Sequence, residues 1–477
     1  MNEARGYLDV LRIRGFLYLW LAQIASLLAL NSSLFVTIIL VSKATGSDTQ
    51  TAGVIAAFNI PAIFLSAFGG IVVDRVSKKV MLVTTNALRI GFQLVLTLVA
   101  FLGLSKQIDP AFFILLVYVA IFVSSAVGQF FAPAEGAMIP LLVGREGLLA
   151  ANSLFTLTVV GTQVAAIMLL VPFAIKLIGV INSLLLLGIL YMVATFFASR
   201  LQRDQAPERQ VLSAGSAWRQ AWKEAGEGWD YALKRPVIML AIFQIALVAA
   251  LVYVVGTIAP SYTSSVLGLG PEDAIFIFAP AGVGILGASA FVVRYGPRFH
   301  RYLFPIIGTI LMGLSFLALG LIGSLSGGPQ APLFRLYPNL TLTATSAVSL
   351  ASVFAGVALA FILIPAQTAV QEEAPDEIRG RVLTVQFTLS NALGIIPLLI
   401  IATLTDIYGT PYVVMGVGVA LLVVALVNYL YARQLTRHRR RKPVLQALPI
   451  PGTDVTTVRA DTSNGNDAAV DEQTLPQ

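Results

Sequence analysis

The segment Gly-Ile-Val-Val-Asp-Arg-Val-Ser-Lys-Lys, which begins at Gly70, joins two long apolar runs. Its charged members are Asp74, Arg75, Lys78 and Lys79, and Gly70 stands about one helical turn before the acid. Charged groups at the end of an apolar helix can bond to a neighbouring helix end, and such bonds can break again. The spacing therefore predicts a reversible contact between two parts of the chain that move relative to each other.

Composition places these charges in a membrane protein. The chain has 477 residues, of which 57% are hydrophobic and 12% charged, with a mean hydropathy of +0.84. Soluble proteins contain about 25% charged residues. Several apolar stretches also exceed the roughly 18 residues that indicate a membrane-spanning helix. We therefore expect a polytopic membrane protein.

Residues suited to enzyme chemistry are scarce. There is no cysteine, and the two histidines, His300 and His438, lie in a predicted loop and tail. Gly282, Gly284 and Gly287 form a literal G-x-G-x-x-G, but this motif lies inside an apolar run with no preceding strand, so it indicates close helix packing. With no P-loop, metal cluster or paired carboxylates, the sequence predicts a protein that is not an enzyme and needs no cofactor or metal.

Hydropathy predicts an all-α integral membrane protein with twelve transmembrane helices. The spans are expected near 16–41, 51–73, 80–103, 111–131, 150–172, 178–199, 238–262, 271–293, 303–325, 344–366, 382–404 and 410–432.

Lysine and arginine are distributed unevenly between the two faces. With the N-terminus inside, 26 of the 31 fall in inner segments and four (Lys43, Lys106, Lys176 and Arg335) in outer loops. This bias predicts that both termini are cytoplasmic, and it explains the net charge of +7 without a nucleic-acid partner. We call the face that carries those four residues the predicted outer face.

An internal repeat divides the spans into two six-helix halves. Six residues recur at a fixed offset of 232, near the ends of spans four and ten and the starts of spans five and eleven. They are Pro133, Ala134, Ala137, Phe155, Thr156 and Leu157, which match Pro365, Ala366, Ala369, Phe387, Thr388 and Leu389. We expect halves over 1–199 and 238–432.

Two segments are predicted to lie outside the membrane core. In the cytoplasmic linker 200–237, Trp218, Trp222 and Trp229 recur at helical spacing, which indicates an amphipathic helix on the membrane surface. Residues 433–477 are expected to form a disordered cytoplasmic tail.

The segment from Gly70 resembles the signature Gly-x-x-x-Asp-Arg-x-Gly-Arg/Lys-Arg/Lys of the major facilitator superfamily, with Ser77 at the second glycine. Residues 130–134, 227–236 and 375–382 are similar to a bacterial exporter subgroup that includes the enterobactin exporter and macrolide-efflux proteins. The resemblance implies a secondary transporter in the plasma membrane (a bacterial inner membrane). It also implies alternating access and, as the family default, export by proton antiport.

Charge pairing would let the loop act as a gate. Asp74 is expected to accept hydrogen bonds from the start of span eleven near Arg381, and Arg75 to pair with Asp376 or Glu377. The gate candidates are Gly70, Asp74, Arg75, Lys78, Lys79, Glu135, Asp376, Glu377, Arg379 and Arg381. The alternative is a charged loop that only anchors topology.

Arg89 is the only ionisable residue well inside a predicted span, and burying it requires a partner. It could bind an anionic group or steer protons, or it could be structural and bond to Asn86 or to helix-end carbonyls. No span contains an obvious buried carboxylate, and Glu135 is the nearest. This absence, together with Ala166 and Ile167 where relatives have Gly-Pro, weakens the case for proton coupling.

Uncharged polar and aromatic side chains mark the expected substrate cavity, and they suit a mostly apolar molecule. With Arg89, the candidates are Asn31, Tyr118, Gln163, Gln244, Tyr253, Gln367 and Asn391. Any one of them could instead form an interhelical hydrogen bond.

Three functions fit these residues. The first is a monomeric transporter that exports small amphipathic, drug- or siderophore-like molecules across the lipid bilayer, with protons as the candidate coupling ion. The others are an uptake carrier and a membrane sensor or scaffold that does not transport.

Overall fold

The computed structural model describes residues 7–73, 76–204, 226, 229–295, 298, 303–325, 332–337, 340–374 and 376–440. Asp74 and Arg75 lie outside the described residues, as do most of the predicted linker helix and the chain from 441 onward. Residues Met1–Tyr429 form one compact unit, and Leu430–Gln477 form a second.

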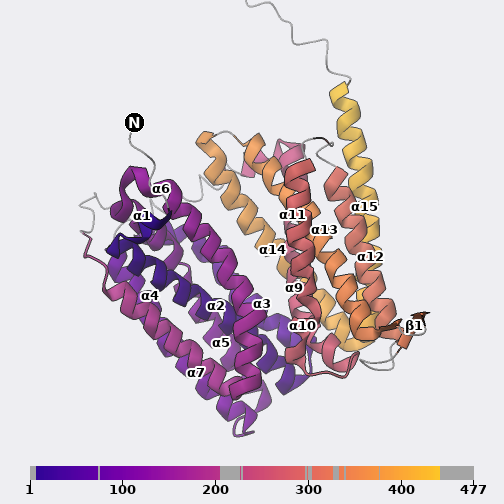
Figure 1. Cartoon of the computed structure of the whole chain (residues 1–477), viewed down its shortest axis with the longest axis horizontal. Helices are drawn as coiled ribbons and strands as arrows, with labels where there is room; N and C mark the ends of the chain where they lie inside the picture. The colour runs from indigo at the N-terminus through magenta and orange to yellow at the C-terminus, as the bar shows by residue number, and fades with distance from the viewer. Residues whose placement is uncertain are drawn as a thin grey trace, which may run out of the picture. The chain divides into compact units, whose positions relative to one another are not determined.

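The described residues of the first half form helices and no strands. In chain order they are α1 (Tyr7–Leu11), α2 (Arg14–Thr45), α3 (Asp48–Val73), α4 (Lys78–Leu104), α5 (Pro110–Gly128), α6 (Phe131–Ala165), the π-helical turn η1 (Ala166–Leu170) and α7 (Val171–Ser199). Figure 1 shows α2 to α7 gathered in one bundle, coloured indigo to magenta.

The second half adds one short hairpin to its helices. Its elements are α9 (Pro236–Ser265), the 3-10 turn η2 (Pro271–Asp273), α10 (Ala274–Phe278), α11 (Pro280–Tyr295), α12 (Leu303–Leu325), β1 (Pro332–Tyr337), β2 (Leu340–Thr343), α13 (Ala344–Glu373), α14 (Asp376–Tyr408) and α15 (Thr410–Arg440). Strands β1 and β2 pair antiparallel.

Helical structure covers each of the twelve predicted spans. Among the described residues, nine helices are long and apolar enough to cross a bilayer, and a shorter apolar helix covers Pro280–Val292. The prediction of an all-α membrane fold is confirmed.

Element boundaries differ from the prediction in three places. The expected inner loop 132–149 is largely helical, because α6 begins at Phe131 and only bends at Gly144, where φ is 67°. Spans five and six join at Gly179, whose φ of 78° is readily reached only without a side chain. Helix α15 continues to Arg440 and not to 432, so the first eight residues of the predicted disordered tail are helical, with no glycine or proline there to break the helix.

Small residues set the tightest helix contact in the second half. A Cβ atom on Gly356 of α13 would lie 1.9 Å from the carbonyl oxygen of Ala281 on α11, and one on Gly284 would lie 2.1 Å from the carbonyl oxygen of Val353. No side chain fits at such distances, so the backbones of α11 and α13 pack directly together. The glycine motif of span eight is thus a packing feature, as predicted.

The two halves meet along α3. This helix packs against α5 and α2 of its own half and against α14 and α9 of the other. Helices α3 and α14 run antiparallel, because the N-terminus of α3 and the C-terminus of α14 share hydrogen bonds. Contacts along this pair of helices therefore report on how the halves engage.

Candidate functional site

The structure describes the predicted inner gate only in part. Gly70 lies in α3, while Lys78 and Lys79 begin α4. The second-half members lie in the first turns of α14, but their side chains lie outside what the structure describes; they are Asp376, Glu377, Arg379 and Arg381. The gate stays a prediction.

Asp204, which the sequence analysis missed, anchors the start of α4. Its carboxylate accepts a hydrogen bond from the Ser77 hydroxyl at 2.6 Å and from the backbone N–H groups of Lys78 and Lys79 at 2.7 and 3.0 Å. Partial burial alone would raise the pKa of Asp204, but these bonds outweigh burial and lower it. Lys78 is thus tied to a residue at the start of the linker, just after α7, so it contributes to folding whether or not it also serves a gate.

A buried polar cluster surrounds Arg89, which lies about 16 Å along α4 from Lys78. Its side chain is 2% exposed, and its guanidinium donates to the Ser26 hydroxyl at 3.0 Å. Ser26 in turn donates to Asn86 at 2.8 Å. The expected link to Asn86 therefore runs through a serine of α2.

Aromatic rings and one glycine complete the environment of Arg89. The guanidinium carbon lies 5.7 Å from the ring centroids of both Phe131 and Tyr191. A Cβ atom on Gly128 would lie 2.1 Å from the Arg89 terminal nitrogen. A side chain at position 128 would therefore displace the guanidinium from this place, an effect that the composition of the chain does not reveal.

Glu135 corrects the expectation that the spans contain no buried carboxylate. It is 6% exposed and lies within electrostatic range of Arg89. From the sequence, Glu135 was expected at the inner end of span four. Helix α6 begins four residues earlier, and the side chain is buried. Among the described residues, Glu135 Oε1, Arg89 Nε and the Tyr191 hydroxyl make no hydrogen bond. The cluster therefore has spare capacity to bind a proton or a polar group.

Tyr253, predicted to line the cavity, instead bridges the halves. Its hydroxyl lies 2.9 Å from Asn59 Oδ1 on α3 and 2.6 Å from Asn391 Oδ1 on α14. Each amide is oriented by donating to its own helix, to the carbonyls of Ile55 and Phe387. One hydroxyl proton thus serves two acceptors, and only the bond to Asn59 crosses between the halves.

The remaining cavity candidates do not share one site. Tyr118 donates to the Gln50 carbonyl at 2.8 Å, which joins α5 to α3. Gln244 is buried, Asn31 and Gln367 are half-buried, and Gln163 is exposed. The structure thus brings together Tyr253 and Asn391, and it places Arg89 in a separate cluster.

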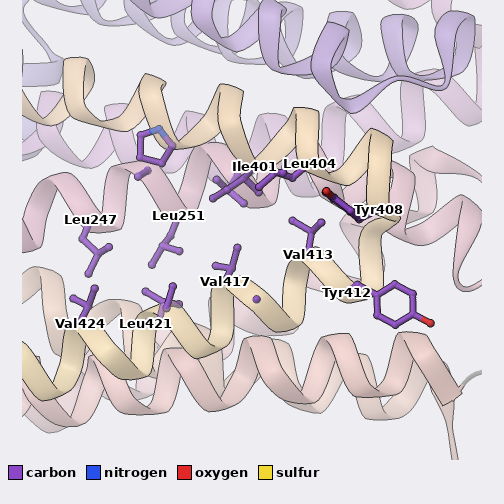
Figure 2. A pocket seen from close by; sticks show the side chains of 15 residues that line it. Leu247, Leu251, Ile401, Leu404, Tyr408, Tyr412, Val413, Val417, Leu421 and Val424 are labelled. Carbon is purple, nitrogen blue, oxygen red and sulfur yellow. The ribbon is translucent and has the colours of Figure 1, made fainter.

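A cavity of about 750 Å³ lies between α9, α14 and α15. Leucine, isoleucine and valine side chains dominate its wall, and Figure 2 shows Tyr408 and Tyr412 at one end with Leu247 and Val424 at the other. None of the predicted cavity residues lines it. Its wall consists mainly of apolar residues, which in a membrane protein do not stand out in the sequence.

Comparison with known proteins identifies the fold family. The family model described as "Major Facilitator Superfamily" matches residues 19–397. The chain belongs to this superfamily. It is accordingly a multi-pass membrane transporter for a small-molecule substrate and not an enzyme.

Individual superfamily members are similar at lower identity. A protein named "Putative bacilysin exporter BacE" from Bacillus subtilis is 27% identical over 342 residues, which cover 70% of this chain and 75% of that protein. The "Uncharacterized MFS-type transporter YkuC" of Bacillus subtilis (strain 168) is 24% identical over 451 residues, which cover 89% of this chain and 93% of that protein.

Solved transporter structures share the fold. The nucleoside transporter NupG superposes with a TM-score of 0.66 at 14% identity, over 87% of this chain and 99% of its own. The peptide transporter POT superposes with a TM-score of 0.68 at 13% identity, over 91% of this chain and 97% of that chain. At these identities the likeness concerns the fold alone.

Proposed function

We propose that this transporter exports small amphipathic molecules by alternating access of its two halves. The similarity to a protein named as a bacilysin exporter supports export. The charge bias supports cytoplasmic termini in a bacterial inner membrane. The resemblance of residues 130–134, 227–236 and 375–382 to the enterobactin-exporter and macrolide-efflux subgroup belongs to the same proposal.

The observation that carries this proposal is the Tyr253 bridge. It lies beside Asn59, about 16 Å along α3 from Asp48, which is near the middle of a hydrocarbon core of about 30 Å. When the halves separate, Tyr253 can keep donating to Asn391 in its own half. The inter-half bond can therefore break without leaving the hydroxyl unpaired, as alternating access requires.

Substrate class follows from the apolar cavity. Its volume lies within the roughly 300–1,000 Å³ typical of ligand pockets. The exposed Tyr408 and Tyr412 supply hydroxyl groups at the membrane-surface end. This arrangement fits a molecule with an apolar body and a polar end. The buried Glu135 supports protons as the coupling ion, which the sequence alone did not favour.

Everted vesicles with lipophilic fluorescent dyes added to the outer medium test direction and substrate class together. We expect dye accumulation that depends on an imposed proton gradient and falls severalfold in Val417→Trp, because an indole would fill the cavity. Val419→Trp is the matched control, since Val419 lies on the same helix and is 54% exposed. Accumulation only in right-side-out vesicles would indicate uptake, and none in either orientation would favour the sensor.

The register of α3 and α14 supports the proposed inner gate. Asp48 bonds to Asp406 and Thr49 to Thr403, and Asn59 and Asn391 bond to the same Tyr253 hydroxyl. Residue numbers therefore rise along α3 as they fall along α14, at nearly the same rate. Continued at this spacing, the register would bring the last residue of α3 (73) opposite 377–381. This is the segment that the sequence analysis paired with the loop after α3.

Replacing Asp74 by asparagine should lower the rate of dye export about tenfold while leaving membrane insertion intact, because a charge-assisted hydrogen bond is worth about 1.5–3 kcal/mol. Asp204→Asn is the control: it removes a capping carboxylate near the same membrane face, but one that joins α4 to the start of the linker and not to the second half. Equal rates for Asp74→Asn and the wild type in the vesicle assay would show that the loop only anchors topology.

A further inference from the structure

Two carboxylates meet at the predicted outer end of the α3–α14 pair. Asp406, near the C-terminus of α14, accepts hydrogen bonds from the Ser47 hydroxyl at 2.7 Å and from the backbone N–H groups of Asp48 and Thr49 at 2.7 and 3.0 Å. It thereby caps the N-terminus of α3, where free N–H groups and the helix dipole favour an anion. This cap joins one half to the other.

Asp48 adds a second link between the halves. It is 2% exposed, and its carboxylate accepts a hydrogen bond from the Ser261 hydroxyl on α9. The space around both acids is polar, with a volume of about 420 Å³, and further hydroxyl groups of Ser264, Ser265 and Thr410 line it. A third link on this face is the ion pair of Lys176 with Asp273.

We propose that Asp406, Asp48 and Ser261 form an outer latch that closes when Asp48 is protonated and opens when it ionises. The latch rests on the proposed alternating access, because it presupposes halves that separate at this face. It also mirrors the predicted inner gate on the same helix pair. Asp406 lies in the last turn of α14 and bonds to the start of α3. Asp74 is expected to reach from the end of α3 to the start of α14.

Charge supports the dependence on protons. Asp48 precedes the membrane span expected over 51–73. Burial, together with the nearby charge of Asp406, raises the pKa of Asp48 to about 7. The hydrogen bond from Ser261 lowers this pKa but does not outweigh burial. The helices packed against α3 carry other ionisable groups toward this face: Lys43 on α2, Tyr118 on α5 and Tyr262 on α9, with Asp109 just before α5.

The sign of the effect follows from linkage. An exposed carboxyl has a pKa of about 3.9, so the closed latch binds the proton more tightly than an open one does. Closure is favoured at low pH, and this advantage is lost as the pH rises through about 7. From pH 6 to pH 8 the ratio of closed to open molecules should fall about tenfold.

Spin labels measure this ratio directly, because the chain has no cysteine of its own. Gln107→Cys and Ser324→Cys place labels on exposed positions at the predicted outer ends of the two halves. In the full chain in nanodiscs, we expect the short-distance population to decrease about tenfold relative to the long one between pH 6 and pH 8. Asp48→Asn, which mimics the protonated acid, should stay closed at both values, and Asp406→Asn should shift the population toward the long distance at both.

Asp109→Asn is the matched control. Asp109 is an exposed aspartate that caps α5 on the same face within one half, through the N–H groups of Ala111 and Phe112. It should behave as wild type.

A pH response that survives in Asp48→Asn, or a short-distance population that survives in Asp406→Asn, would overturn the latch. Ser261→Ala, which removes one hydroxyl, supplies the second test if Asp406→Asn fails to fold. Dye export in vesicles then shows separately whether the transport function stands.

Discussion

Replacing Arg89 by methionine is expected to lower the free energy of unfolding by about 3–5 kcal/mol, the usual effect of leaving a buried charge without its partner. The substitution keeps most of the side-chain volume but leaves Glu135, which is 6% exposed, without a cation. It also removes the donor to Ser26. Thermal unfolding of the detergent-purified protein, followed by size-exclusion fluorescence, measures the loss.

A double-mutant cycle separates the charge effect from packing. Glu135→Gln in the Arg89→Met background should recover a large part of the lost stability, because no unpaired charge then remains in the bundle. Arg12→Met is the control: Arg12 pairs with Asp9 at 3.7 Å, but its side chain is 81% exposed, so its removal should have little effect. Additive losses for Arg89→Met and Glu135→Gln would contradict the electrostatic coupling.

The fold was largely predictable because hydropathy and charge act over whole spans. Twelve apolar runs, the lysine and arginine bias and the repeat of Pro133 at Pro365 all reflect constraints repeated along the chain. The errors came from single residues. Gly144 and Gly179 bend helices that the sequence analysis divided elsewhere, and a glycine indicates a bend only when its φ is known.

The site was predicted less well, because polar residues in a membrane bundle must satisfy one another. Tyr253 and Asn391 were predicted to line the cavity, yet the two share a hydrogen bond, and neither lines the space between α9, α14 and α15. Asp48 and Asp406 lie at span ends, where sequence gives no reason to prefer one acid over another. The offset between α3 and α14 could have paired them, but that offset is known only from the three-dimensional contacts.

Glu135 shows how a boundary error becomes a functional one. With span four ending at 131, Glu135 was expected at the inner end of that span and was considered only as a gate residue. Helix α6 instead starts at Phe131, and the same residue becomes a buried carboxylate near Arg89. Proton coupling, which the sequence argued against, thereby gains a candidate residue.

Replacing Tyr253 by phenylalanine is expected to shift the two halves toward the state that is open on the predicted outer face, by about 5-fold to 150-fold. The substitution leaves Asn59 Oδ1 and Asn391 Oδ1 without their shared donor in the closed state. An unsatisfied buried acceptor costs about 1–3 kcal/mol. In the open state water can reach Asn59, so most of this cost falls on the closed form alone.

Tyr262→Phe distinguishes a bridge from a merely buried hydroxyl. Tyr262 is 2% exposed and donates to the Leu319 carbonyl at 2.7 Å, but both residues belong to the second half. Its loss should lower stability without changing the spin-label distance between Gln107→Cys and Ser324→Cys. Tyr253→Phe should do the reverse, with a small loss of stability and a large change in distance. If both variants changed only stability, Tyr253 would be a packing residue, and the closed state would depend on the contacts at the helix ends.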